Sequence, residues 1–401
     1  MAYQNLFIVA FFILLYSVFA KKIEGSVISG PFLALAFGVL FGPLLMNLFQ
    51  AKVETEEYRI IAELALALVL FTDASKANLR VLENNVGLPV RLLLIGLPLC
   101  IAFGALGGFL IFKGFSWIEL GILATMLTPT DAALGKAVVS NPAVPTKIRE
   151  SLNVESGLND GICVPVLFLL IAVFASQTGE GLSSFYGLQV LGKEIGIGLL
   201  AGCMLSFIGF RLIQLSVKRK WLSKSWETMF IVALSFSCFA LAQLTGGSGF
   251  IACFAGGFLF GVLRRKADFK LELLESAEGT GDTFSLITWL IFGSLVIAGF
   301  IHELTWQVAL YAILSLTVIR ILPVFIALIH TGLSGKEKAF MGWFGPRGLA
   351  SIVFAIMVLE VDLPHKSTII LTVAFTIVLS VVLHGFTAKP FIKALGGNPH
   401  P

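Results

Sequence analysis

The chain has 401 residues, 57% of them hydrophobic and 13% charged, whereas soluble domains carry about 25% charged residues. This composition excludes a soluble protein of several domains and predicts an all-α polytopic membrane protein. The formal net charge of +4 does not indicate a nucleic-acid partner, because Lys and Arg occur in short clusters between apolar runs, as membrane anchors do.

Apolar runs of helix length recur along the whole chain and predict about 13 membrane-spanning helices. These runs occupy residues 5–20, 27–49, 59–74, 87–112, 117–139, 149–176, 187–214, 227–244, 248–263, 283–301, 306–330, 338–359 and 367–387. We interpret residues 1–401 as a single membrane-embedded unit with two inverted six-helix repeats. The first repeat spans 1–176, a linking helix spans 187–214, and the second repeat spans 227–387.

Lys and Arg gather in every second loop, beginning with Lys21 and Lys22 after the first span. By the positive-inside rule, this alternation places the N-terminus outside and the C-terminus in the cytoplasm of a cell (inner) membrane. No positive segment precedes the first span, which favours a retained helix over a signal peptide. On the cytoplasmic side, Asp73 ends the third span, where it attracts cations into a funnel or simply caps the helix.

The fifth span contains Thr128-Pro129-Thr130-Asp131. Because proline lacks a backbone N–H and disrupts the helix, we expect an interruption here. Ionisable side chains at membrane depth usually mark an ion pathway or a buried pair. The sequence therefore predicts that this break takes part in transport.

The sixth span displays a polar arc among apolar residues. At helical spacing, the arc consists of Asn153, Ser156 and Asp160 on one face and of Glu155 and Asn159 on a neighbouring stripe. A GxxxG step, Gly157 and Gly161, is expected to let the broken fifth span approach closely.

Oxygen ligands suit a hard monovalent cation. We predict a cation and proton site, with Na⁺ as the metal, made by Asp160, Ser156, Thr130 and Asp131. Burial of a carboxylate favours its protonated form, so Asp160 holds a proton or a cation in turn. Because Asn159 stands where a second carboxylate would fit, one proton is expected to exchange for one cation; a plain packing role for Asn159 is the alternative.

The twelfth span contains Gly345-Pro346-Arg347-Gly348 and is also expected to be interrupted. Spans five and twelve hold corresponding places in the two repeats, and matching breaks are typical of a transporter's binding site. Two ordinary proline kinks are the alternative. A lone buried charge is costly, so we predict that Arg347 pairs with Glu155 as a scaffold.

Other charged groups receive weaker assignments. Arg320, deep in the eleventh span, is expected to pair with a carboxylate or with backbone carbonyls. The segment 264–282 predicts a cytoplasmic amphipathic connecting helix. Four histidines fall near the predicted membrane edges, where a pH sensor is one interpretation: His302, His330, His365 and His384.

With these residues considered, the chain resembles the cation:proton antiporter superfamily, and within it the asparagine–aspartate branch of NhaP-type sodium/proton antiporters. The resemblance rests on Thr130-Asp131, on Glu-Ser-Gly-Leu-Asn-Asp at 155–160 and on Gly-Pro-Arg-Gly-Leu-Ala-Ser at 345–351. The family often has proline after Thr-Asp, whereas Ala132 follows here, which predicts an earlier helix break.

The resemblance implies secondary Na⁺/H⁺ antiport by alternating access, without enzymatic activity or a cofactor. It implies a core part from 87–176 and 306–387, a dimerisation part from 1–74 and 227–301, and a homodimer. Within the core, it assigns cation and proton binding to Asp160, Ser156, Thr130 and Asp131. It assigns an organising role to Asn159, Glu155 and Arg347.

Three alternatives remain at this point. A sodium-coupled symporter of organic anions would need more polar residues near the breaks. An intramembrane serine protease would use Ser248 of Gly246-Gly247-Ser248-Gly249 with His302. A channel would carry current without saturating competition by protons. The cysteines lie in apolar runs without CxxC spacing, which argues against metal or redox use.

Overall fold

A computed structural model covers residues 1–401. The structure describes residues 2–24, 28–49, 56–76, 87–131, 133–139, 141–178, 184–265, 273–300 and 303–395. Within these ranges the regular structure is helical and contains no strand. The all-α prediction is therefore confirmed for the described part of the chain.

Each predicted span coincides with one helix or with consecutive helical pieces. In chain order the elements are α1 (Ala2–Glu24), α2 (Gly30–Phe41), α3 (Glu56–Lys76), α5 (Gly87–Arg91), η1 (Leu92–Gly96), α6 (Leu97–Ile111), α7 (Trp117–Met126), α8 (Lys136–Val139), α9 (Thr146–Thr178), α10 (Ser184–Lys218), α11 (Lys224–Leu244), α12 (Gly249–Arg265), α13 (Leu273–Phe300), α14 (Trp306–Leu316), α15 (Val318–Ala327), α16 (Gly335–Trp343), α17 (Leu349–Leu359) and α18 (Lys366–Ala394).

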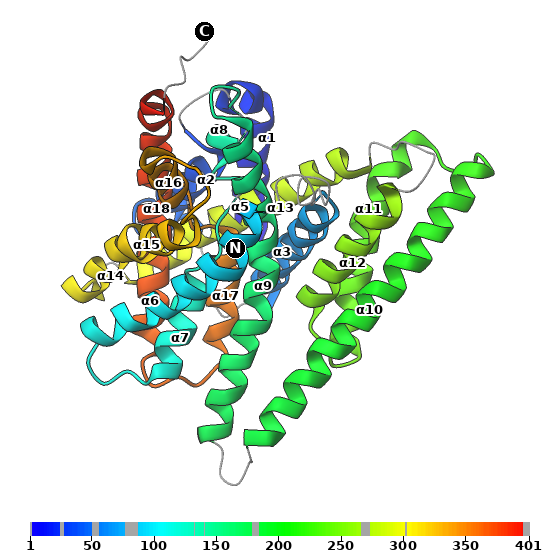
Figure 1. The fold of residues 1–401 in the computed structure, drawn as a ribbon. Coiled ribbons are helices and arrows are strands. Elements are labelled where there is room, and N and C mark those ends of the chain that lie inside the picture. Colours follow the sequence, from blue (N-terminus) through cyan, green and yellow to red (C-terminus); the bar gives the residue numbers. More distant parts are fainter. Residues whose placement is uncertain are drawn as a thin grey trace. The chain divides into compact units, whose positions relative to one another are not determined.

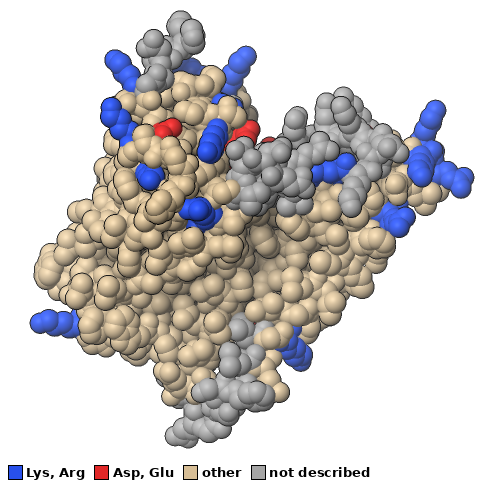
Figure 2. All heavy atoms as spheres, in the orientation of Figure 1, with Lys and Arg blue, Asp and Glu red and all other residues tan. Residues whose placement is uncertain are grey.

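The long helices are apolar enough to lie in a bilayer. Among the described residues, six helices combine the length and hydropathy needed to cross a membrane, and several shorter helices are also apolar. On α10, large side chains such as Leu200, Met204 and Leu212 point outward and are mostly exposed, as expected for a face that meets lipid. On the face shown in Figure 2, wide areas between the Lys and Arg side chains carry no charge.

The helices divide into two compact units. The first comprises Met1–Ile60, Leu79–Asn159 and Ser285–Pro401, and the second comprises Ile61–Asn78 and Asp160–Phe284. Helix α9 contributes its first turns to the first unit and the rest to the second.

In the first unit, α14, α17 and α18 pack together, and α15 packs on α16 (Figure 1). A buried apolar cluster joins the short α8, the start of α9, and α15, α16 and the end of α18. Its members include Val138, Ile148, Val324, Met341 and Ile392. This core holds α8 and α16, the short helices beside the two breaks, in place, because well-packed interiors resist displacement.

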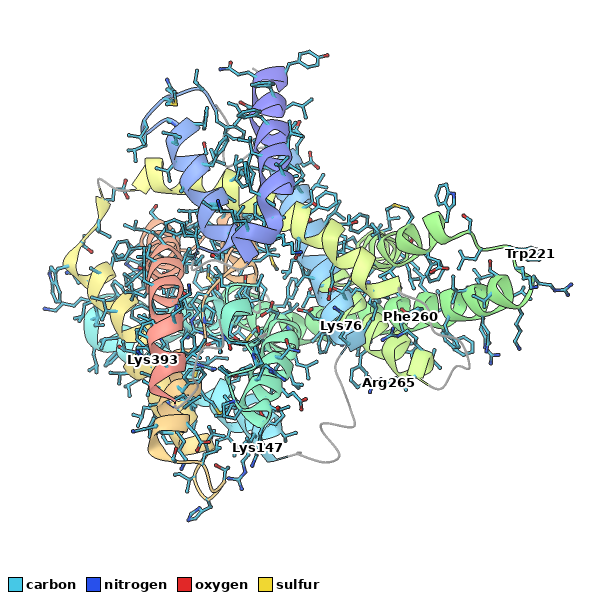
Figure 3. The ribbon with its side chains drawn as sticks, turned by 90° about the horizontal axis from the view of Figure 1, so that it is seen from above. Lys76, Lys147, Trp221, Phe260, Arg265 and Lys393 are labelled. Atoms are coloured by element: carbon cyan, nitrogen blue, oxygen red, sulfur yellow. The ribbon has the colours of Figure 1, made fainter. Side chains whose placement is uncertain are left out.

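In the second unit, α10, α11 and α12 lie side by side, as Figure 1 shows. Phe260 of α12, labelled in Figure 3, is fully buried and contacts the rings of Phe71, Phe210 and Phe230. Glycine allows close backbone approach here, since a Cβ on Gly202 would overlap the backbone of Ala252.

Four predicted spans are interrupted or irregular. The two expected breaks occur at 127–135, between α7 and α8, and at 344–348, between α16 and α17. The eleventh span also breaks, at Thr317, whose hydroxyl bonds back to the Ile313 carbonyl at 2.7 Å, an interaction that often bends helices. The fourth span contains the π-helical turn η1 just before Pro98, which cannot donate a backbone hydrogen bond.

A Cβ on Gly161 would overlap the ring of Phe254, so this glycine packs closely against α12. The segment 264–282 lies partly outside the described residues, and its last part, 273–282, forms the beginning of α13.

Candidate functional site

The first break opens where α7 ends. The Thr128 hydroxyl donates to the Ala124 carbonyl at 2.8 Å, and Pro129 follows without a backbone N–H. Beyond it, the Asp131 carboxylate accepts from the backbone N–H groups of Ala133 (2.8 Å) and Leu134 (3.0 Å). Asp131 therefore caps the turn that leads into α8, a common role for aspartate at helix starts.

The second break is hydrogen-bonded to the first. The backbone N–H of Asp131 donates to the Pro346 carbonyl at 2.7 Å. The second carboxylate oxygen of Asp131 accepts from the Leu349 N–H at 2.9 Å, at the start of α17. One aspartate thus satisfies exposed backbone groups of two interrupted helices, which otherwise lack partners inside a membrane.

Helix α9 holds Thr130 from both of its oxygens. The Ser156 hydroxyl donates to the Thr130 carbonyl at 2.6 Å, and the Asn159 amide donates to the Thr130 hydroxyl at 2.7 Å. Asn159 is 2% exposed, and no described group donates to its Oδ1. Asp160 comes next on the same helix, one turn after Ser156, and is 8% exposed.

The buried acid on α9 has a different partner from the one predicted. Glu155 forms an ion pair with Arg320 at 2.7 Å, and both side chains are almost fully buried. The prediction that Glu155 pairs with Arg347 is therefore wrong, whereas the expectation that Arg320 meets a carboxylate is confirmed. The break at Thr317 lies one turn before Arg320, at the start of α15, the helix that carries Arg320 to the pair.

Arg347 instead binds the exposed carbonyls of other helix ends. Its guanidinium donates to the Thr128 carbonyl at 2.8 Å, to the Pro129 carbonyl at 3.3 Å and, near the end of α14, to the Ser315 carbonyl at 3.4 Å. A positive group at the carboxyl end of a helix is favourable because carbonyl dipoles point toward it. Arg347 therefore links the second break directly to the first.

The structure brings most of the predicted site residues together in the first unit: Thr130, Asp131, Glu155, Ser156, Asn159 and Arg347. Asp160 and Asp73 belong to the second unit. Asp73 is half-buried on α3, and its role at a cytoplasmic funnel stays a prediction. Around Thr130, the oxygens able to bind a cation are hydroxyl, amide and backbone carbonyl groups, a set that suits a hard ion.

Sequence reasoning missed the way both interrupted spans begin. Helix α7 starts with a capping box of Ser116 and Glu119, and α16 starts with the same arrangement of Ser334 and Glu337. Both follow the Ser-x-x-Glu pattern, which is readable in a sequence. The matching caps support the correspondence of spans five and twelve.

Ser248 caps the start of α12, since its hydroxyl accepts from the Ile251 N–H at 3.3 Å. His302, the proposed partner of Ser248 in a protease, lies outside the described residues. His384 is buried within α18, which continues to Ala394, and its place near a membrane edge stays a prediction.

Comparison with known proteins identifies the family. Residues 7–394 match the model of the transmembrane sodium/hydrogen exchanger family. The chain is 25% identical to the K⁺/H⁺ antiporter NhaP of Alkalimonas amylolytica, over 84% of this chain and 57% of that protein. It is 29% identical to the Na⁺/H⁺ antiporter NhaH of Halobacillus dabanensis, over 68% of each.

The fold has a close counterpart among solved structures. The sodium proton antiporter MjNhaP1 from Methanocaldococcus jannaschii, solved at pH 8, superposes with a TM-score of 0.72. The alignment covers 99% of this chain and 98% of that one at 19% identity. Together with the family match over nearly the whole chain, this likeness excludes the protease fold considered above. The chain therefore belongs to the transmembrane sodium/hydrogen exchanger family.

Proposed function

We propose that this protein is a secondary active antiporter that exchanges a small monovalent cation, Na⁺ first among them, for protons. The observation that carries the proposal is the pair of hydrogen bonds from α9 to Thr130. Ser156 donates to the Thr130 carbonyl and Asn159 donates to the Thr130 hydroxyl, both within one turn of Asp160. A break in one helix and a buried carboxylate on another are the ingredients of an ion site in a membrane.

Competition at Asp160 provides the exchange. A buried carboxylate is stable when it holds a proton or a metal ion, and it cannot hold both. The cation displaces the proton on one side of the membrane, and the proton displaces the cation on the other. Ser156 and Thr130 supply further oxygens for the cation. Asp131 contributes through the backbone that it fixes, because three N–H groups already occupy its carboxylate.

The charge next to Asp160 sets the stoichiometry. Asn159 is neutral, and Glu155 is neutralised by Arg320. One titrating carboxylate then exchanges one proton for one monovalent cation, so the cycle is electroneutral. Asn159, Glu155 and Arg347 organise the site without binding the transported ion.

The wider architecture follows from the same proposal. We infer about 13 spans, arranged as two inverted repeats, 1–176 and 227–387, around the linking helix 187–214. Alternating access moves a core part (87–176 and 306–387) against a dimerisation part (1–74 and 227–301) in a homodimer. The protein lies in the inner membrane with its N-terminus outside. The Lys and Arg alternation between spans supports this orientation.

The identity of the cation needs a direct comparison. Relatives include both Na⁺/H⁺ and K⁺/H⁺ antiporters, and this chain spans little more than half of the K⁺/H⁺ relative's length. Purified protein in liposomes that contain a pH-sensitive dye should report proton movement on addition of Na⁺, Li⁺ or K⁺. We expect Na⁺ and Li⁺ to drive it and K⁺ to drive it weakly.

The decisive variant is Asp160→Asn, which keeps the side-chain volume and removes the titrating group. We expect Na⁺-driven proton flux to fall at least about 100-fold, because removal of an essential proton-carrying group lowers rates by about this factor or more. The matched control is Asp362→Asn, an exposed aspartate in the loop before α18, which should retain normal flux. Flux at the wild-type level in folded Asp160→Asn protein would contradict the proposal.

A further inference from the structure

A face of α18 carries polar side chains that the exchange mechanism above does not use. Ser380, His384 and Thr387 follow one another at helical spacing, and Ser380 and His384 are buried. All three contact residues at the break between α16 and α17. Buried polar groups are costly unless each contact is satisfied, so this arrangement needs an explanation.

His384 holds the carboxyl end of α16. Its Nε2 lies 2.8 Å from the backbone carbonyl of Trp343, the last residue of that helix. A carbonyl oxygen only accepts, so Nε2 carries a proton in this contact. The indole N–H of Trp343 adds a bond to the Thr387 hydroxyl at 2.9 Å. Helix α18 thus satisfies a carbonyl that the end of α16 leaves exposed.

Ser380 holds the other side of the same break. Its hydroxyl oxygen accepts from the backbone N–H of Arg347 at 2.8 Å. The His384 Nδ1 lies 3.1 Å from the Ser380 hydroxyl and 2.8 Å from the Ser380 carbonyl. In the neutral ring with its proton on Nε2, Nδ1 is an acceptor, so its hydrogen-bond partner is the Ser380 hydroxyl and not the Ser380 carbonyl.

We propose that Ser380 and His384 are positioning residues that clamp both ends of the break at 344–348 and thereby set the affinity for the transported cation. The proposal rests on the antiport function proposed above. The clamped residues are Trp343 and Arg347. The Pro346 carbonyl, which lies between them in the chain, accepts from the Asp131 N–H, and the Arg347 guanidinium donates to the Thr128 and Pro129 carbonyls. The clamp therefore acts on Thr130 through two short connections.

The clamp acts on binding more than on turnover. A segment held at both ends presents its hydrogen-bonding groups without further loss of conformational entropy when the ion arrives. Removing one anchor forces the ion to order the segment on binding, which weakens ground-state affinity. A purely structural role would instead reduce the amount of folded protein and leave the apparent KM of the remainder unchanged.

The experiment compares His384→Leu, His384→Gln and Ser380→Ala in proteoliposomes, with apparent KM for Na⁺ and maximal proton flux measured separately. We expect His384→Leu and Ser380→Ala to raise KM about tenfold, as loss of one net hydrogen bond predicts, with maximal flux changed less than about twofold. Glutamine retains a donor at the position of Nε2, so His384→Gln should return KM to within about threefold of wild type.

Thr372→Ala is the matched control, because Thr372 is buried on the same helix and its hydroxyl donates to the Thr368 carbonyl within α18. This variant should keep the wild-type KM. Unchanged KM in both His384→Leu and Ser380→Ala, or equal behaviour of His384→Leu and His384→Gln, would overturn the proposal.

Hydrogen–deuterium exchange gives a readout that needs no transport. Peptides covering 344–348 should exchange faster in His384→Leu and Ser380→Ala than in wild type or Thr372→Ala, because the Arg347 N–H and its segment lose an anchor. Unchanged protection would refute the clamp. If the wild-type protein transports no cation in exchange for protons, the antiport proposal fails. The hydrogen–deuterium measurement still decides whether the clamp exists.

Discussion

Glu155 and Arg320 place two full charges in an apolar interior, where a single ion would cost several times the stability that one hydrogen bond supplies. Their contact at 2.7 Å makes this burial tolerable, and it also ties α9 to α15. Such pairs contribute little net stability compared with a well-packed apolar pair, but removing one partner leaves the other uncompensated. The pair therefore specifies how these two helices meet.

At the level of this pair, Arg320→Met should destabilise the protein strongly. We expect a loss of about 3–5 kcal/mol, the usual cost of stranding a buried charge, visible as a lower melting temperature in detergent. Glu155→Gln combined with Arg320→Met should recover part of that loss, because no full charge then remains unpaired. Arg219→Met, at an exposed position after α10, is the control. Equal melting of Arg320→Met and Arg219→Met would contradict this account.

The two interrupted spans act as one structural element because their breaks bind each other. Arg347 reaches the first break, and Asp131 reaches the second. The capping boxes at Ser116 and Ser334 hold the beginnings of α7 and α16 by local bonds. Arg347 of the second break holds the end of α7, and Asp131 of the first break holds the start of α17. This crossing needs a residue without a side chain where the Asp131 carboxylate approaches the start of α17.

Gly348 is that residue, and Gly348→Ala tests the crossing. A Cβ on Gly348 would overlap the carboxylate of Asp131. Alanine should therefore push Asp131 away from the Leu349 N–H. We expect the apparent KM for Na⁺ to rise at least about tenfold, the effect of losing one hydrogen bond or more. Gly335→Ala, at the start of α16, meets no atom within 4 Å and should behave as wild type. Equal transport kinetics of the two variants would show that the close approach is unimportant.

For the whole molecule, the helices and both main breaks were predictable, because a bilayer forces apolar segments to satisfy their own backbone groups. Proline and glycine residues at 129 and within 345–348 mark where the helical backbone hydrogen bonds are interrupted. The partner of Glu155 was not predictable: Arg320 and Arg347 both lie far along the chain in apolar runs, and helix spacing gives no distance between helices. The break at Thr317 and the burial of His384 likewise depend on tertiary contacts that local patterns do not contain.

The charge balance of the whole cycle gives a prediction that no single contact provides. Among the acidic groups next to the breaks, Glu155 is paired with Arg320, and the Asp131 carboxylate is occupied by backbone N–H groups. In the proposed cycle, Asp160 is the group that changes its charge, by trading one proton for one cation. The proposed cycle therefore moves the same charge through the membrane in both directions.

Transport should therefore be insensitive to membrane potential. Moving one net charge per cycle across 100 mV is worth about 2.3 kcal/mol, enough to change a rate by up to about 50-fold. In proteoliposomes with a potential set by K⁺ and valinomycin, we expect Na⁺-driven proton flux to change less than about twofold between 0 and −100 mV. Liposomes with a protonophore control for leak. A rate that follows the potential would mean that a second group titrates, and Asp131 would be the first candidate.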